Sequence, residues 1–75
     1  MNKTRRKTLE EIISTLETAR DLLTEVAEEE WEAFDNLPEN FQYSEMGETM
    51  SETADDLEEN RDNLDYIIEN LQEYV

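Results

Sequence analysis

Apolar side chains recur along the first half of the chain at alternating steps of three and four residues. The series consists of Leu9, Ile12, Leu16, Ala19, Leu23 and Val26. This spacing places the side chains on one stripe of an α-helix, in the heptad pattern of a helix packed against another helix. Thr8 followed by Glu11 fits a capping box at the start of such a helix. The sequence therefore predicts a first helix over residues 8–36.

A second apolar series follows with the same alternation of steps and one charged member. It consists of Met50, Ala54, Leu57, Arg61, Leu64, Ile68, Leu71 and Val75. Ser44 is a preferred type of N-cap residue, and Glu45 and Glu48 then fall in the first turn, where carboxylates are favoured. Gly47 is expected to weaken that turn. The prediction is a second helix over residues 44–75.

The residues that join the two series, 37–43, carry turn signals. Pro38 disfavours helical geometry at Leu37 and is tolerated in the first turn of a short helical piece. A connection this short suits antiparallel neighbours. The sequence thus predicts an all-α fold, an antiparallel two-helix hairpin of coiled-coil type, in which facing residues have numbers that sum to about 80. In that register Arg61 faces Ala19, a residue small enough to leave room for the arginine stem.

Some apolar residues fall beside the predicted contact. They are Ile13, Leu22, Ala27, Ile67 and Tyr74. They widen the apolar stripe beyond what one partner helix can cover, and a chain of 75 residues has only a thin core of its own. We therefore expect two hairpins to associate as a homodimer, in a four-helix bundle.

Charge restricts the classes of partner. The chain has 22 acidic and 6 basic residues, a net charge of −16, and neither cysteine nor histidine. Nucleic acids and anionic bilayers would repel this surface, so we expect a basic protein partner, no direct contact with nucleic acid and no contact with a membrane. The chain lacks both an apolar run long enough for a membrane span and the apolar core of a signal peptide, which predicts a cytoplasmic protein.

The first seven residues form a basic tag. Lys3, Arg5, Arg6 and Lys7 are four of the six cations. In an antiparallel hairpin they would lie beside Glu69 and Glu73 at the open end and compensate their charge, with each exposed pair contributing at most about 1 kcal/mol. The alternative is a tail that contacts RNA or a second acidic protein.

Neither a cofactor nor a metal ion is expected. Without histidine or cysteine the usual transition-metal ligands are missing, and the residues around Gly47 lack the ligand spacing of a calcium loop. Acid clusters such as residues 28–30 or Asp55-Asp56 fall at solvent-facing helix positions, whereas paired carboxylates need burial to take separate acid and base roles. The sequence thus favours a protein that is not an enzyme.

Aromatic residues gather around the predicted turn. They are Trp31, Phe34, Phe41 and Tyr43. One interpretation is a small apolar core that caps the end of the hairpin, because each ring removes on the order of 150 Å² from water. The other is an exposed recognition patch with an acidic rim, because aromatic side chains are enriched among binding hot spots.

The segment FDNLPENFQYSEMGE, which starts at Phe34, resembles a block that recurs in small acidic proteins encoded by phages and prophages of Gram-positive bacteria. The resemblance extends from Glu28 to about Leu57 and covers the flanks by pattern alone. It implies a helical hairpin and an origin in a mobile element. It transfers neither an activity nor a catalytic residue.

The acidic surface is the strongest functional candidate in the sequence. A helix of about 30 residues is about 45 Å long, so the acids would present one negative charge per roughly 2 Å of axis, against roughly 1.7 Å in B-DNA. Such a rod could mimic nucleic acid in the basic groove of a host DNA- or RNA-binding protein and inhibit it. The alternative is a structural or assembly module whose acidity serves solubility only. The candidate acidic face consists of Glu25, Glu28, Glu29, Glu32, Asp55, Asp56, Glu58, Glu59 and Asp62.

Overall fold

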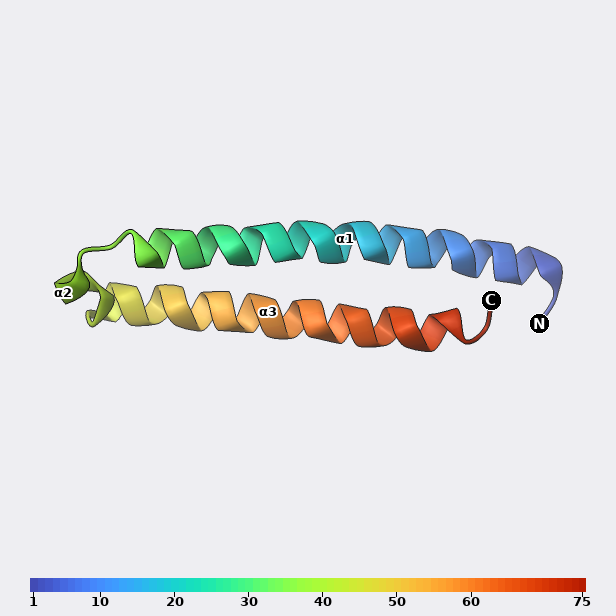
Figure 1. Ribbon diagram of the computed structural model, residues 1–75. Coiled ribbons are helices and arrows are strands. Elements are labelled where there is room, and N and C mark those ends of the chain that lie inside the picture. The colour runs from blue at the N-terminus through green and yellow to red at the C-terminus, as the bar shows by residue number, and fades with distance from the viewer.

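Two long helices lie side by side and run in opposite directions (Figure 1). The computed structural model describes all residues 1–75, of which 87% are helical, and contains no strand. Its elements are α1 (Lys3–Asp35), α2 (Glu39–Gln42) and α3 (Glu45–Gln72). The all-α prediction is confirmed, with α1 and α3 in contact. The molecule is a rod of 58 × 14 × 12 Å whose termini lie at one end and whose turn lies at the other.

Helix α1 begins five residues before the predicted start at Thr8. The side chain of Asn2 caps it, accepting a hydrogen bond from the backbone N–H of Arg5 at 2.8 Å. The Thr8 hydroxyl donates instead to the carbonyl of Thr4, as a threonine within a helix does. The basic tag is therefore the first turn of α1, and the Asn2 cap offsets the unfavourable position of cations at the positive end of the helix.

At the turn, Gln42 ties α2 to the end of α1. Its side-chain Nε2 donates to the carbonyl oxygens of Phe34 at 3.3 Å and Leu37 at 3.2 Å. The Phe34 carbonyl also accepts from the backbone N–H of Leu37 at 3.0 Å, so the amide adds a second bond at the end of the helix, where carbonyls lack the usual helical partner. The short helical piece expected within residues 37–43 is α2, which Pro38 precedes as N-cap.

The start of α3 depends on its glycine. Ser44 is the N-cap, as predicted, and its Oγ accepts from the N–H of Gly47 at 3.4 Å. A Cβ atom on Gly47 would lie 2.3 Å from the carbonyl oxygen of Gln42 and 2.6 Å from that of Phe41. The expectation that Gly47 merely weakens this turn was incomplete, because only a glycine lets α2 pack this closely against α3.

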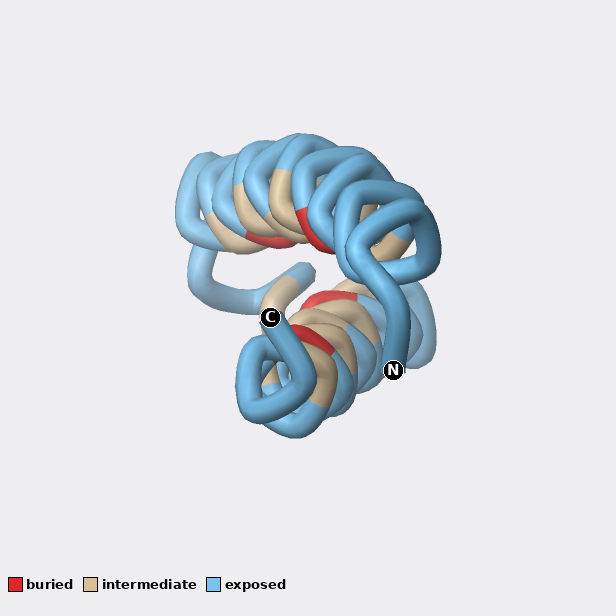
Figure 2. Tube along the Cα trace, turned by 90° about the vertical axis from the view of Figure 1, so that its right-hand side faces the viewer, coloured by how far each residue is buried: buried red, intermediate tan, exposed pale blue.

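A seam of partly or fully buried positions runs between the two helices (Figure 2). On α1 the seam consists of Leu9, Ile13, Leu16, Arg20, Leu23, Ala27, Glu30 and Phe34. On α3 it consists of Gly47, Met50, Ala54, Leu57, Arg61, Leu64, Ile68 and Leu71. The apolar series predicted for the second helix is confirmed up to Leu71, whereas Val75 follows the end of α3 and is exposed.

The series predicted for the first helix is wrong at every second member. Ile12, Ala19 and Val26 are exposed, whereas Ile13 and Ala27, which were expected to lie outside the contact, are buried. Both choices share Leu9, Leu16 and Leu23 and differ by a rotation of the helix. The observed rotation also brings Phe34 into the seam, seven residues after Ala27, where the predicted one would have placed only an alanine. Burial of the larger ring favours the observed rotation.

Arg20 therefore occupies the seam position that was predicted for Ala19. Its guanidinium crosses to α3, where Nη1 donates to Asp65 at 2.9 Å. Arg61, also in the seam, pairs only with its neighbour Asp62 at 3.0 Å. The prediction that Arg61 faces Ala19 across the contact is wrong, because Ala19 faces solvent.

Candidate functional site

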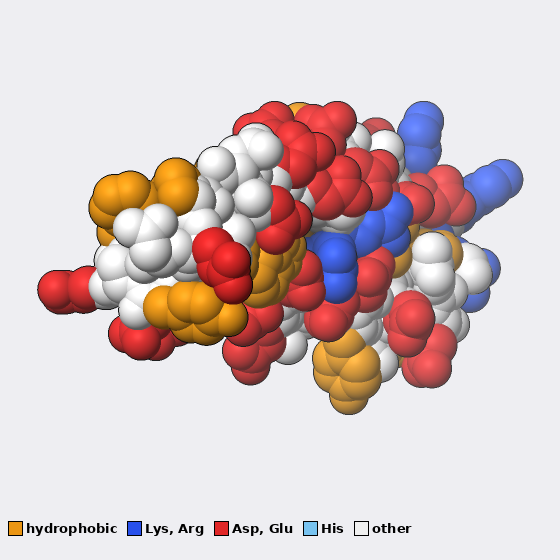
Figure 3. Space-filling model, turned by 60° about the vertical axis from the view of Figure 1, so that its left-hand side comes forward, with side chains coloured by type: hydrophobic (Ala, Val, Ile, Leu, Met, Phe, Trp, Pro, Cys, Tyr) orange, Lys and Arg blue, Asp and Glu red, His pale blue; other side chains and the backbone are white.

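Acidic residues are concentrated at one end of the rod. We call residues 22–59 the turn half, and residues 1–21 with 60–75 the open half. The turn half holds 14 acids and no cation, whereas the open half holds 8 acids and all 6 cations, which gives net charges of −14 and −2. Figure 3 shows acidic side chains spread over the surface, with basic ones at the open end and midway along the rod. The excess charge thus belongs almost entirely to the turn half.

The structure leaves most of the predicted acidic face free in solvent. The exposed members are Glu25, Glu28, Glu29, Glu32, Asp55, Asp56, Glu59 and Asp62. Of these, Asp62 accepts hydrogen bonds from Arg61. Glu58 differs from the rest, because it is half-buried and accepts a hydrogen bond from Nε1 of Trp31. Glu58 therefore has a structural role, because its carboxylate is hydrogen-bonded to α1.

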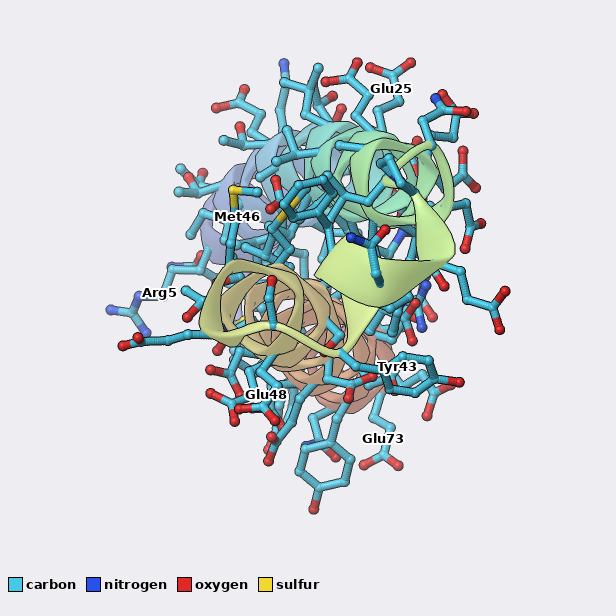
Figure 4. The ribbon with its side chains drawn as sticks, turned by 90° about the vertical axis from the view of Figure 1, so that its left-hand side faces the viewer. Arg5, Glu25, Tyr43, Met46, Glu48 and Glu73 are labelled. Atoms are coloured by element: carbon cyan, nitrogen blue, oxygen red, sulfur yellow. The ribbon has the colours of Figure 1, made fainter.

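These carboxylates do not form a single face. Glu25 and Glu32 lie seven residues apart on the outer side of α1, and Glu52 and Glu59 lie likewise on the outer side of α3. Figure 4, which looks along the rod from the turn end, shows Glu25 and Glu73 projecting in opposite directions. The acids thus surround the rod on its outer sides, and the prediction of one acidic face was too narrow.

Several acids of the turn half lie outside the predicted acidic face. They are Glu30, Asp35, Glu39, Glu45, Glu48 and Glu52. A signal was present in α3, where Glu48, Asp55, Asp62 and Glu69 recur every seven residues and so form one exposed column along the helix.

Charge density distinguishes the turn half from the rod as a whole. Over the full 58 Å, the 22 acids amount to one per about 2.6 Å of axis. In the turn half, 14 acids over roughly half that length give one per about 2 Å. B-DNA carries one charge per roughly 1.7 Å. The density expected from the sequence for the whole rod is reached only in the turn half.

The aromatic residues divide into two groups. Trp31 and Phe34 are half-buried and pack edge to face, with ring centroids 5.8 Å apart and planes at 81°. This is a favourable geometry for two aromatic rings. Phe41 and Tyr43, in contrast, have exposed fractions of 47% and 78%. Trp31 and Phe34 belong to the core, so the candidate patch of four aromatics reduces to Phe41 and Tyr43.

Arg20 is the most strongly held charge in the molecule. It pairs with Asp65 across the seam and with Asp21 beside it at 3.1 Å. These hydrogen bonds, that to Asp65 first, raise the pKa of Arg20 above its ordinary value. The guanidinium is a permanent cation that links the two helices within the open half.

The four cations of the basic tag form no ion pair. The ion pairs of the structure involve only Arg20 and Arg61. The expected compensation of Lys3 to Lys7 by Glu69 and Glu73 is therefore not formed as salt bridges. The reason is length, because α1 has 33 residues and α3 has 28, and the first turn of α1 extends past the end of α3 (Figure 1).

The surface offers no enclosed binding site. Its depressions lie along the first 22 residues and are open to solvent. Acidic side chains nowhere converge in a group of three that could hold a metal ion. Neither long helix contains a stretch that is apolar enough, over a sufficient length, to cross a membrane. The surface therefore offers a partner charged groups and exposed apolar side chains.

Comparisons with protein-family models, with curated proteins and with solved structures give no match for this chain.

Proposed function

We propose that this chain is a non-enzymatic binding protein of a mobile element, and that its turn half mimics nucleic acid in the basic groove of a DNA- or RNA-binding protein of the host. The observation that carries the proposal is the unmixed charge of the turn half, 14 acids without one cation. Their carboxylates are mostly exposed, and their number per length of axis is close to that of DNA phosphates. A basic groove would recognise such a rod by its charge.

The strength of the charge supports binding over solubility. Solubility of a small domain requires a net charge of magnitude about 2 to 8, and a larger excess opposes compaction through self-repulsion. The net charge here is −16, and the chain keeps its cations away from the half that carries most of it. Segregation of this kind has no role in solubility alone.

A second candidate is a structural or assembly module whose acidity is incidental. The exposed apolar residues outside the turn favour it, among them Ile12, Leu22 and Ile67. The two functions are compatible if assembly and partner binding use different surfaces. We propose accordingly that two copies associate as a homodimer, in a four-helix bundle.

A capture experiment tests the mimicry. The immobilised protein is incubated with a lysate of a Gram-positive bacterium, and bound proteins are eluted by steps of salt or by duplex DNA. We expect to capture nucleic-acid-binding proteins whose elution depends steeply on salt, because each neutralised contact adds to the salt dependence. Duplex DNA should also displace them. Bound proteins that neither salt nor DNA releases would contradict mimicry.

Matched variants locate the contact. Glutamine at Glu28, Glu29 and Glu32 removes three exposed charges from the turn half, and we expect at least tenfold weaker capture. The control places glutamine at Glu10, Glu11 and Glu69, which removes three exposed charges from the open half. Equal losses in both variants would show that net charge, and not the turn half, governs binding.

A further inference from the structure

The two flanks of the seam differ in burial. On one flank the residues next to the seam are half-buried, and Trp31 donates across it to Glu58. On the opposite flank every residue next to the seam is exposed. We call this second surface the acid-free flank; it consists of Arg5, Ile12, Ala19, Val26 and Ala33 on α1 and Met46, Thr53, Asn60 and Ile67 on α3.

The acid-free flank is chemically unlike the rest of the surface. Of the 22 acids, none lies in either of its two columns. Ile12, Val26 and Ile67 expose 42%, 47% and 43% of their surface there. Figure 4 shows Arg5 and Met46, from opposite ends of the rod, on the same side of the molecule. A largely apolar strip whose own columns hold no acid thus runs along the rod, with Glu29, Glu30 and Asp56 at its borders.

We infer that the acid-free flank is the surface on which a second copy of this chain docks, with the two rods antiparallel. The inference rests on the proposed homodimer and adds its surface and its orientation. Repulsion between two copies of so acidic a protein is weakest where each presents the fewest carboxylates, and a two-fold contact brings the same strip from both copies together. A basic partner, by contrast, would find no acid to bind on this flank.

The size of the strip suits a dimer. The whole face of the rod that bears the strip is 58 Å long and about 14 Å wide, a projected area of roughly 800 Å², which is what each partner contributes to an interface of standard size. The single hairpin fully buries only four apolar residues, so it has much apolar surface left to cover.

Charge determines the orientation. If the rods were parallel, two turn halves of net charge −14 each would lie side by side. If they are antiparallel, each turn half lies beside an open half, where Lys3 to Lys7 are unpaired. The attraction between the basic tag of one copy and the acids of the other then favours docking.

The spacing of the strip fits the same two-fold axis. Ile12 and Val26 lie equally far from Ala19 along the sequence, so an axis at Ala19 brings Ile12 of one copy against Val26 of the second copy. On α3, Thr53 and Ile67 are likewise symmetric about Asn60. The small side chain of Ala19 allows the two α1 helices to approach closely at the axis.

Adjacent residues provide a matched pair of variants. Ile67→Glu places a charge on the acid-free flank, whereas Tyr66→Glu places the same charge on the outer side of α3, where Tyr66 is 66% exposed. By sedimentation at micromolar concentrations we expect a dimer for the unmodified chain and for Tyr66→Glu. For Ile67→Glu we expect a dissociation constant at least tenfold higher. Circular dichroism confirms that each variant is folded. A monomeric unmodified chain, or equal weakening by both variants, would overturn the inference.

Single introduced cysteines test the orientation, because the chain has no cysteine of its own that would react as well. Ala19→Cys should form disulfide-linked dimers on mild oxidation. Spin labels on Ala33→Cys should lie about 40 Å apart, because 14 residues of helix separate each from the axis. A separation under about 20 Å would show parallel rods and overturn the antiparallel arrangement. These measurements report mass and distance, so a failure here is distinct from a failure to capture a host protein.

Discussion

The turn half and the open half differ in where their charged residues lie, on the surface or in the seam. In the turn half the seam contains Leu23, Ala27 and Phe34 together with the half-buried Glu30, and α2 closes its end, yet the surface repels itself strongly. In the open half the charges nearly balance, yet the seam is interrupted by Arg20 and Arg61. The densest charge thus lies at the end of the rod that α2 closes.

This coincidence has a physical meaning. Like charges on neighbouring helices favour separation, and their repulsion grows as the helices approach. At the turn, the bond from Trp31 to Glu58 and the bonds from Gln42 to the end of α1 hold the helices together against that repulsion. A surface that is both rigid and strongly charged results, and a groove that binds it need not pay the entropy of ordering it.

The most severe way to break this contrast is Gly47→Ala. The added Cβ would meet the carbonyl oxygens of Gln42 and Phe41, which are backbone atoms that cannot turn away. We expect a loss of about 2–3 kcal/mol in the free energy of unfolding, measured by urea denaturation. Thr49→Ala, at an exposed position of the same helix, is the control and should change it by less than about 0.5 kcal/mol. An unchanged stability of Gly47→Ala would show that α2 does not fix the turn.

A smaller effect is expected for Trp31→Phe. The substitution keeps an aromatic ring beside Phe34 but removes the Nε1 donor to Glu58. We expect a loss of about 1 kcal/mol in the free energy of unfolding, also by urea denaturation. Tyr43→Phe removes a hydroxyl from a side chain that is almost fully exposed and should be neutral. Equal effects of the two variants would mean that the bond to Glu58 does not stabilise the turn half.

The smallest expected effect is an increase in stability, and it concerns the open half. Arg61→Leu extends the apolar seam between Leu57 and Leu64 and removes only an exposed pair with Asp62. We expect a gain of about 0.5 kcal/mol, seen as a melting temperature higher by a few degrees. Arg20→Leu should gain less, because it also loses the bond to Asp65. A lower melting temperature for Arg61→Leu would show that the arginine stabilises the seam.

The sequence predicted the elements of this fold better than their rotation. Seven-residue spacing located α3 and its buried stripe, and Ser44 marked its start. In α1 the apolar residues occupy three neighbouring columns, so spacing alone could not decide between Ile12 and Ile13. Tertiary contacts decided it, through the ring of Phe34 and the reach of Arg20 to Asp65.

The candidate surface was predictable in composition but not in arrangement. Counting charges identified the acids, yet the commitment of Glu58 to Trp31 depends on how the two helices meet. The acid-free flank was also hidden, because its columns on α1 and α3 become one surface only after the chain has folded back. The role of Gly47 depends in the same way on the position of α2.

The placement of both termini at one end of the rod has a mechanical consequence (Figure 1). A force applied between Met1 and Val75 would peel α3 from α1 one seam layer at a time, as a zipper opens, instead of shearing all layers together. The layers at Arg20 and Arg61 would yield before the apolar ones beyond them. The acid-rich end would be the last to come apart under load.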